Sequence, residues 1–119
     1  MKNRIPNPCR LLIVGINPGR LTEEVDAPFA YPGNRFWPAL EAADITPYRV
    51  HANEGLSEED AAMLAERGIG FTNLVGRMTP KASDLSKAEL VEGGEVVRSV
   101  VEKHQPRACL LYTSDAADD

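Results

Sequence analysis

The stretch Arg10-Leu-Leu-Ile-Val-Gly-Ile16, followed by Asn17-Pro18-Gly19, decides the fold of this chain. A short apolar run that ends in glycine and proline is typical of a buried strand in a parallel sheet. The Asn-Pro-Gly sequence then predicts a turn at the end of that strand. Because ligands bind beyond the carboxyl ends of parallel strands, this turn is also the first place to expect a functional site.

The rest of the chain predicts helices that alternate with two further strands, with caps, breakers and apolar spacing marking their bounds. The predicted elements are a long loop over residues 20–33, a helix from Asn34 to Ala43, a helix from Ser57 to Gly68, a strand over 69–75, a loop over 76–84, a helix that begins at Ser86 and that Pro106 stops, and a strand over 108–112. This order predicts an α/β fold with parallel strands and right-handed crossovers.

The helix after residue 85 carries the most detailed prediction. Ser86-Lys87-Ala88-Glu89 has the pattern of a capping box, in which Ser86 and Glu89 each bind the other's backbone N–H. Apolar residues recur along the helix at helical spacing, and we expect them to form its buried face. That predicted face comprises Leu90, Gly94, Val97, Val101 and His104.

The composition fits one soluble domain, since the chain has 119 residues, of which 43% are hydrophobic and 26% charged. No apolar run approaches the ~20 residues of a membrane span and no leader opens the chain, so we expect a cytoplasmic protein without membrane contact. Cys9 and Cys109 lack the spacing of a disulfide framework or a cysteine-based zinc site. His51 and His104 are too isolated for a metal cluster, and we therefore expect no metal.

The net charge of −5 argues against a strongly basic nucleic-acid-binding surface. The charge is unevenly placed, because the last five residues carry three acidic side chains and no basic one. Without those five residues the count is 13 basic against 15 acidic side chains, a net charge of −2. DNA binding is therefore neither excluded nor favoured by charge.

The segment Gly15–Gly19 is the strongest candidate for a functional site. Its two glycines allow a ligand to approach the backbone closely, and Pro18 fixes the turn. Asn17 carries an amide that both donates and accepts hydrogen bonds at the carboxyl edge of the sheet. Two interpretations are open from the residues alone: a turn without further role, or a turn that presents Asn17 to a ligand.

Several other residues near the same edge are candidates with open alternatives. Phe29 lies in a loop with little apolar company, where it either stacks on a flat ligand or anchors the loop in the core. Asn73, at the end of the second predicted strand, either binds a ligand or shapes the turn. Arg77 and Lys81 follow in a loop and either contact phosphate or are solvated.

Three blocks of sequence together resemble the mismatch-specific uracil/thymine DNA glycosylases of the uracil-DNA glycosylase superfamily. The blocks are Gly15-Ile-Asn-Pro-Gly19, Pro28-Phe-Ala-Tyr-Pro-Gly-Asn-Arg-Phe-Trp37, and Gly70-Phe-Thr-Asn-Leu-Val75 followed by Arg77 and Thr79. The likeness runs in order, at family-like spacing, from about Leu11 to Leu110. It implies a three-layer α/β sandwich around a short parallel sheet.

The resemblance also implies an activity and residue roles. The activity is hydrolysis of the N-glycosidic bond of uracil or thymine mispaired with guanine, by base flipping, in base excision repair. Asn17 matches the asparagine that positions the attacking water, Phe29 the aromatic that stacks on the flipped base, and Ile16 a position whose backbone touches the base. Asn73 matches a residue that helps to recognise the base in some members. The expected partner is mismatched double-stranded DNA, bound by a monomer without a cofactor, close to the nucleoid in a bacterium.

The resemblance does not extend to the end of the chain. Family members continue past the third strand with a helix, another strand and an Asn-Pro-Ser-like loop that wedges into the duplex, whereas Cys109–Asp119 matches no such segment. We therefore predict that residues 1–112 are the N-terminal part of one glycosylase domain and that 113–119 are a non-family acidic tail. The alternatives to an active glycosylase are an inactive truncated one and a non-catalytic Rossmann-like fragment that holds a nucleotide or phosphate. A G-x-G-x-x-G motif, which would favour that fragment, is absent.

Overall fold

A parallel three-stranded sheet organises the computed structural model, which describes residues 1–112. The strands β1 (Leu11–Gly15), β2 (Ile69–Asn73) and β3 (Ala108–Leu111) lie in the order β2-β1-β3, and both pairings are parallel. The central strand β1 is the predicted apolar run. Its side chains are buried because the sheet is covered on both faces, which is why the run does not alternate with polar residues.

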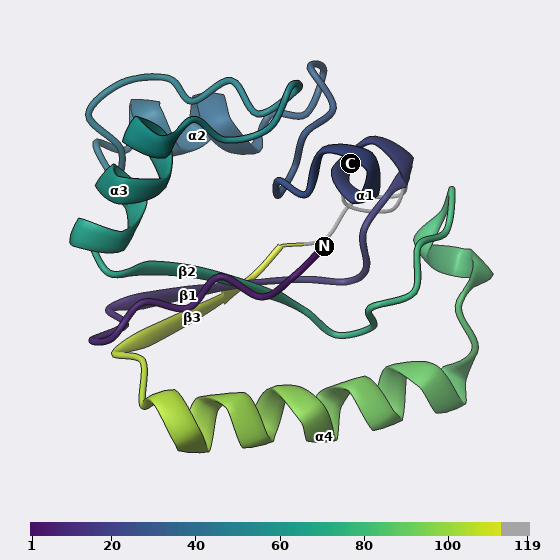
Figure 1. Cartoon of the computed structure of the whole chain (residues 1–119). Coiled ribbons are helices and arrows are strands. Elements are labelled where there is room, and N and C mark those ends of the chain that lie inside the picture. Colours follow the sequence, from purple (N-terminus) through teal and green to yellow (C-terminus); the bar gives the residue numbers. More distant parts are fainter. Residues whose placement is uncertain (113–119) are drawn as a thin grey trace.

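Helices cover the two faces of the sheet and complete a three-layer α/β arrangement (Figure 1). The helices α1 (Arg20–Val25), α2 (Phe36–Ala42) and α3 (Glu58–Glu66) lie on one side, and the long helix α4 (Lys87–His104) lies on the other. A single 3₁₀ turn, η1 (Ala82–Asp84), precedes α4. The α/β class, the parallel sheet and the three layers are confirmed.

The predicted caps are confirmed where local chemistry is strong. The Ser57 hydroxyl accepts from the Asp60 N–H, and Ser86 and Glu89 form the reciprocal capping box of α4. Gly68 follows the end of α3 at φ +72°, a backbone conformation that favours glycine. The N-cap of α2 is Arg35, which makes no side-chain cap hydrogen bond, so the prediction of Asn34 as the cap was wrong by one residue. Asn34 still contributes at the start of α2, because its carboxamide oxygen accepts from the Phe36 N–H at 2.8 Å.

Parts of the prediction were wrong. Residues 20–33 are not one loop, because Arg20–Val25 form α1 after the turn at Gly19; the helix has no strong sequence cap and ends at Asp26, whose φ is +51°. The buried glycine of α4 is Gly93, whereas Gly94 is exposed. A Cβ on Gly93 would lie 2.2 Å from the Leu74 carbonyl oxygen, so the helix turns its closest approach to the sheet layer one residue earlier than predicted.

The rest of the α4 face was predicted in part. Val97, Val100 and Val101 are partly buried and pack against Cys9, Leu12 and Val14 of the sheet layer. Leu90 is exposed, contrary to the prediction. The predicted acidic tail over 113–119 lies outside the described residues, and the domain bounds stay a prediction.

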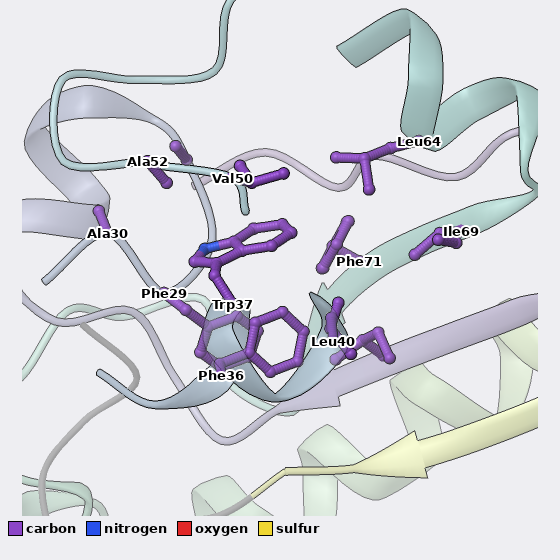
Figure 2. Packing of buried hydrophobic residues seen from close by; sticks show 12 residues of the cluster. Phe29, Ala30, Phe36, Trp37, Leu40, Val50, Ala52, Leu64, Ile69 and Phe71 are labelled. Atoms are coloured by element: carbon purple, nitrogen blue, oxygen red, sulfur yellow. The ribbon is translucent and has the colours of Figure 1, made fainter. Parts of the chain in front are cut away.

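The main core lies between the sheet and the layer of α1, α2 and α3 (Figure 2). Aromatic rings dominate it, with the Phe36 and Trp37 centroids 5.0 Å apart and Trp37 and Phe71 5.7 Å apart. The Trp37 Nε1–H donates to the Pro28 carbonyl at 3.0 Å, which ties the loop before α2 to the core. This loop carries Phe29, so the core decides where Phe29 lies.

The first residues of the chain run along the outer edge of β2. Arg4 forms an isolated antiparallel bridge with Phe71, with N–H···O distances of 3.0 and 2.7 Å. Among the described residues no helix could span a membrane, and no three or more His, Cys, Asp or Glu side chains gather as a metal site would require.

Candidate functional site

The carboxyl ends of β1 and β2 bring the predicted site segments together. Gly15 and Asn73 are register partners at the last position of the two strands. The ladder continues beyond them, because the Leu74 and Val75 N–H groups donate to the Gly15 and Ile16 carbonyls, each at 2.9 Å. The turn after β1 and the loop after β2 are therefore held side by side.

Asn17 lies at the centre of this junction and is fully buried. Its Nδ2 donates to the Thr79 hydroxyl oxygen at 2.7 Å and to the Arg77 carbonyl at 3.0 Å. Its Oδ1 is buried without a hydrogen-bond partner among the described residues. A buried acceptor without a donor costs about 1–3 kcal/mol of stability. Such a group in a folded protein therefore calls for an explanation, for example a bound water or ligand.

Thr79 fixes which way the Asn17 amide points. The Thr79 hydroxyl donates to the Lys81 carbonyl at 2.6 Å, so toward Asn17 it presents only an acceptor. The Arg77 carbonyl is also an acceptor, and both therefore require the NH₂ end of the amide. No role was predicted for Thr79 from the sequence, although it belongs to the third block of the family resemblance. Its contact with Asn17 could not be predicted, because the two residues are far apart in the sequence and only the fold brings them together.

The backbone of the turn is tightly held around Asn17. Gly15, Pro18 and Gly19 are buried, and Ile16 is partly buried. The Thr79 N–H donates to the Pro18 carbonyl at 3.3 Å, which joins the two loops a second time. The turn thus forms one unit with residues 77–79.

Phe29 is a core residue by position and lies at a strained backbone conformation. It is 4% exposed, its ring stacks on Phe36 with centroids 3.9 Å apart, and it forms a T-shaped pair with Tyr112 with centroids 5.0 Å apart. The expectation that it has little apolar company was therefore wrong, because the loop folds back onto α2 (Figure 2). Its φ is +52°, which L-residues adopt at a cost and which often marks functional sites.

Phe29 and Asn73 line one crevice at the end of β2. Met1, Thr22 and Thr72 share its lining, and it has no room for a water molecule. The Met1 side chain is almost fully buried there. The structure thus brings Phe29 and Asn73 to one place, with the beginning of the chain packed into it.

Arg77 and Lys81 differ in their contacts within the protein. The Arg77 guanidinium makes a bidentate pair with Glu89 of α4, with both N···O distances 2.9 Å. The hydrogen bond from Arg77, together with the Ser86 N–H, lowers the pKa of Glu89 to about 2. Lys81 is exposed, and its carbonyl, not its ammonium, serves the Asn17 junction.

The family model described as the uracil DNA glycosylase superfamily matches residues 3–118, which is nearly the whole chain.

Proposed function

The chain belongs to the uracil DNA glycosylase superfamily, whose members are DNA glycosylases, and on that premise we propose that it excises uracil or thymine mispaired with guanine from double-stranded DNA. Its place is then the first step of base excision repair. The chemistry is hydrolysis of the bond between C1′ and the base nitrogen, in which the base leaves and water adds to the sugar.

The observation that carries this proposal is the unpartnered Oδ1 of Asn17. Since Thr79 and Arg77 hold the NH₂ end, the oxygen is the end of the amide that is left to accept a hydrogen bond. An amide oxygen in this position orients a water molecule by accepting one of its protons. Asn17 is no base at physiological pH, so its contribution is orientation, and we expect slow chemistry.

The flipped base is proposed to bind in the crevice between Phe29 and Asn73. Phe29 is rigidly backed by Phe36, and a ring supported on one face is suited to stack a pyrimidine. The Asn73 amide would bind the polar edge of the base. Because the crevice now holds Met1 and no water-sized space, base entry requires the Met1 side chain to leave.

Base flipping and charge stabilisation complete the proposed mechanism. Extruding a base costs a few kcal/mol, and least for a mispaired one, which favours G·U and G·T pairs. As the glycosidic bond breaks, positive charge develops on the sugar and negative charge on the leaving base. Backbone N–H groups of the Gly15–Gly19 turn and the Ile16 backbone would face the base and hold that negative charge.

We propose that Lys81, rather than Arg77, binds a phosphate of the DNA backbone. Lys81 is exposed in the loop after β2. Arg77 lies in the same loop, but a phosphate would have to displace Glu89 from both of its hydrogen bonds. The loop after β2 thus contributes a backbone anchor for Asn17 and one free cation for DNA.

Single-turnover excision tests the proposal, with duplexes that have the same sequence except for one G·U, G·T or A·U pair. Asn17→Ala should lower the excision rate from G·U by ~10²-fold, as expected for loss of a positioned catalytic group. Thr79→Val, which keeps the shape but removes the acceptor, should lower it in the same direction, whereas Thr79→Ser should retain it. Duplex affinity should be unchanged in all three variants.

Two outcomes would count against the proposal. If Asn17→Ala excised the base as fast as the wild type does, Asn17 would have no part in the mechanism. Equal rates on A·U and G·U would leave a uracil glycosylase without mismatch specificity.

A further inference from the structure

A groove at the amino-terminal edge of the sheet, opposite the Asn17 junction, gathers three arginines. It has a volume of about 340 Å³ and is lined by Arg10, Leu11, Asp44, Ile45, Arg67, Ile69 and Arg107. From these side chains we propose that the groove binds a phosphomonoester, the phosphate held by Arg10 and Arg107 and an uncharged body lying on the apolar floor. The inference is independent of the proposed glycosylase activity.

The fold itself makes the arginines converge. Arg10 and Arg107 each immediately precede a strand, and Arg67 precedes β2 by two residues. The first residues of the strands are register partners, Leu11 with Ile69 and Leu11 with Ala108. Three cations that are far apart in sequence therefore reach the same edge, at the left in Figure 1, where α3 and α4 end.

The lining of the groove carries more positive than negative charge. Asp44 is the one acidic residue of its lining, against three arginines, in a chain whose net charge is −5. Arg67 donates from Nη1 to the Ile45 carbonyl at 3.0 Å. Within residues 1–112 the Arg10 and Arg107 side chains make neither an ion pair nor a hydrogen bond, so two guanidinium groups are available to a ligand.

The stem of Arg10 lies against Gly68, so the side chain loses less conformational entropy when a ligand binds. Gly68, at φ +72°, lies against it, and a Cβ on Gly68 would come within 2.7 Å of the Arg10 Cγ. The Arg10 N–H also donates to the Gly68 carbonyl at 2.7 Å. The stem of Arg10 therefore packs against Gly68.

The size and chemistry of the groove select the class of ligand. A volume of about 340 Å³ lies at the small end of the range of small-molecule sites, about 300–1,000 Å³. Guanidinium groups bind phosphate through paired hydrogen bonds. Leu11, Ile45 and Ile69 offer an apolar floor for a planar or aliphatic body, which a free inorganic anion would not use.

Titration calorimetry at low ionic strength tests the site with three probes: adenosine 5′-monophosphate, inorganic phosphate and adenosine. A purine nucleotide is chosen because the proposed base crevice is meant for a pyrimidine. The double variant Arg10→Met/Arg107→Gln keeps an apolar stem over Gly68, and Arg98→Gln, an exposed arginine of α4 paired with Glu102, is the matched control.

We expect the wild type and Arg98→Gln to bind the nucleotide, and the double variant to bind it at least about tenfold more weakly, as loss of charge-assisted hydrogen bonds implies. Adenosine should not bind. Tighter binding of the nucleotide than of phosphate would support the uncharged body on the apolar floor, and equal binding would overturn that part of the proposal and leave a site for free phosphate.

Unaltered excision by the double variant, with an unaltered melting curve, would separate this site from the glycosylase site. Binding that survives in the double variant, binding of adenosine as tight as that of the nucleotide, or no binding of either phosphate probe would overturn the proposal.

Discussion

The amide of Asn17 has one orientation that its surroundings accept, because both groups facing its Nδ2 are acceptors. This arrangement needs Asn17 from one loop and Arg77, Thr79 and Lys81 from another, and neither Asn17 nor Thr79 creates it alone. A single buried polar group without a donor is tolerated in a domain whose total stability is about 5–15 kcal/mol. The unpartnered Asn17 Oδ1 therefore costs the fold some stability.

Phe29 serves the core and, in the proposed function, the base. Phe29→Ala should lower the free energy of unfolding by about 3–5 kcal/mol, because it removes a buried ring from the contact with Phe36. Phe29→Leu fills more of the space and should unfold less readily than the alanine variant, while base capture weakens by ~1–3 kcal/mol through loss of the stack. Urea unfolding and single-turnover excision measure the two effects. A stable Phe29→Leu variant with wild-type excision would make Phe29 a core residue only.

At the scale of elements, α4 approaches the loop after β2 through one glycine. Gly93→Ala should destabilise the protein by about 1–3 kcal/mol, since its Cβ would meet the Leu74 carbonyl oxygen at 2.2 Å. Gly94→Ala is the matched control, because no atom lies within 4 Å of its Cβ, and it should stabilise the helix by up to ~1 kcal/mol. Thermal melts of both variants measure the difference. Equal melting temperatures would mean that α4 does not pack on this backbone in solution.

The start of α4 also holds the loop that carries the Arg77 carbonyl. The pKa of Glu89 is lowered to about 2, first by the Arg77 hydrogen bond, so its stabilising contribution is present above its ordinary value near 4.5 and is lost as pH falls toward 2. Glu89→Gln should therefore melt below the wild type at pH 6, and the difference should shrink between pH 5 and 2. Glu92→Gln, an exposed position on the same helix, is the control. A difference independent of pH would exclude the charged pair as its cause.

At the scale of the whole molecule, the first residues connect β2, α1 and the crevice that Phe29 and Asn73 line. The Lys2 N–H donates to Asp26 Oδ1 at 2.9 Å, and Arg4 Nη2 donates to the Asp26 carbonyl at 2.7 Å. Met1 occupies the crevice that Phe29 and Asn73 line. The N-terminal segment is thus tied down by contacts that lie outside the crevice itself.

Asp26→Gly should loosen this segment without straining the turn, because glycine accepts the φ of +51°. Excision should become a few-fold faster, since one exposed hydrogen bond is worth about 0.5–1.5 kcal/mol. Amide exchange of Arg4, whose N–H donates to Phe71, reports the loosening directly. Asp26→Asn, which keeps an acceptor, is the control. Faster exchange with unaltered excision would show that the segment does not obstruct the base.

Much of the fold could be predicted from local sequence patterns. The apolar run at 11–15, the caps at Ser57 and Ser86, and Gly68 each specify an element or its end through contacts within a few residues. The errors fall where the signal is not local. The helix α1 has no side-chain cap, and the choice between Gly93 and Gly94 depends on how α4 meets Leu74.

The sequence by itself determined the α/β class, the position of the turn at Asn17 and the candidates Phe29 and Asn73. Only the tertiary structure decided the partners of Asn17, the burial of Phe29, the pairing of Arg77 with Glu89 and the convergence of three arginines. The reason is physical: the spacing of apolar and capping residues along the chain determines secondary structure only locally, over a few turns of helix or one strand. Contacts between residues far apart in the sequence, such as Asn17 and Thr79 at 62 positions, form only when the parallel strands are paired in register.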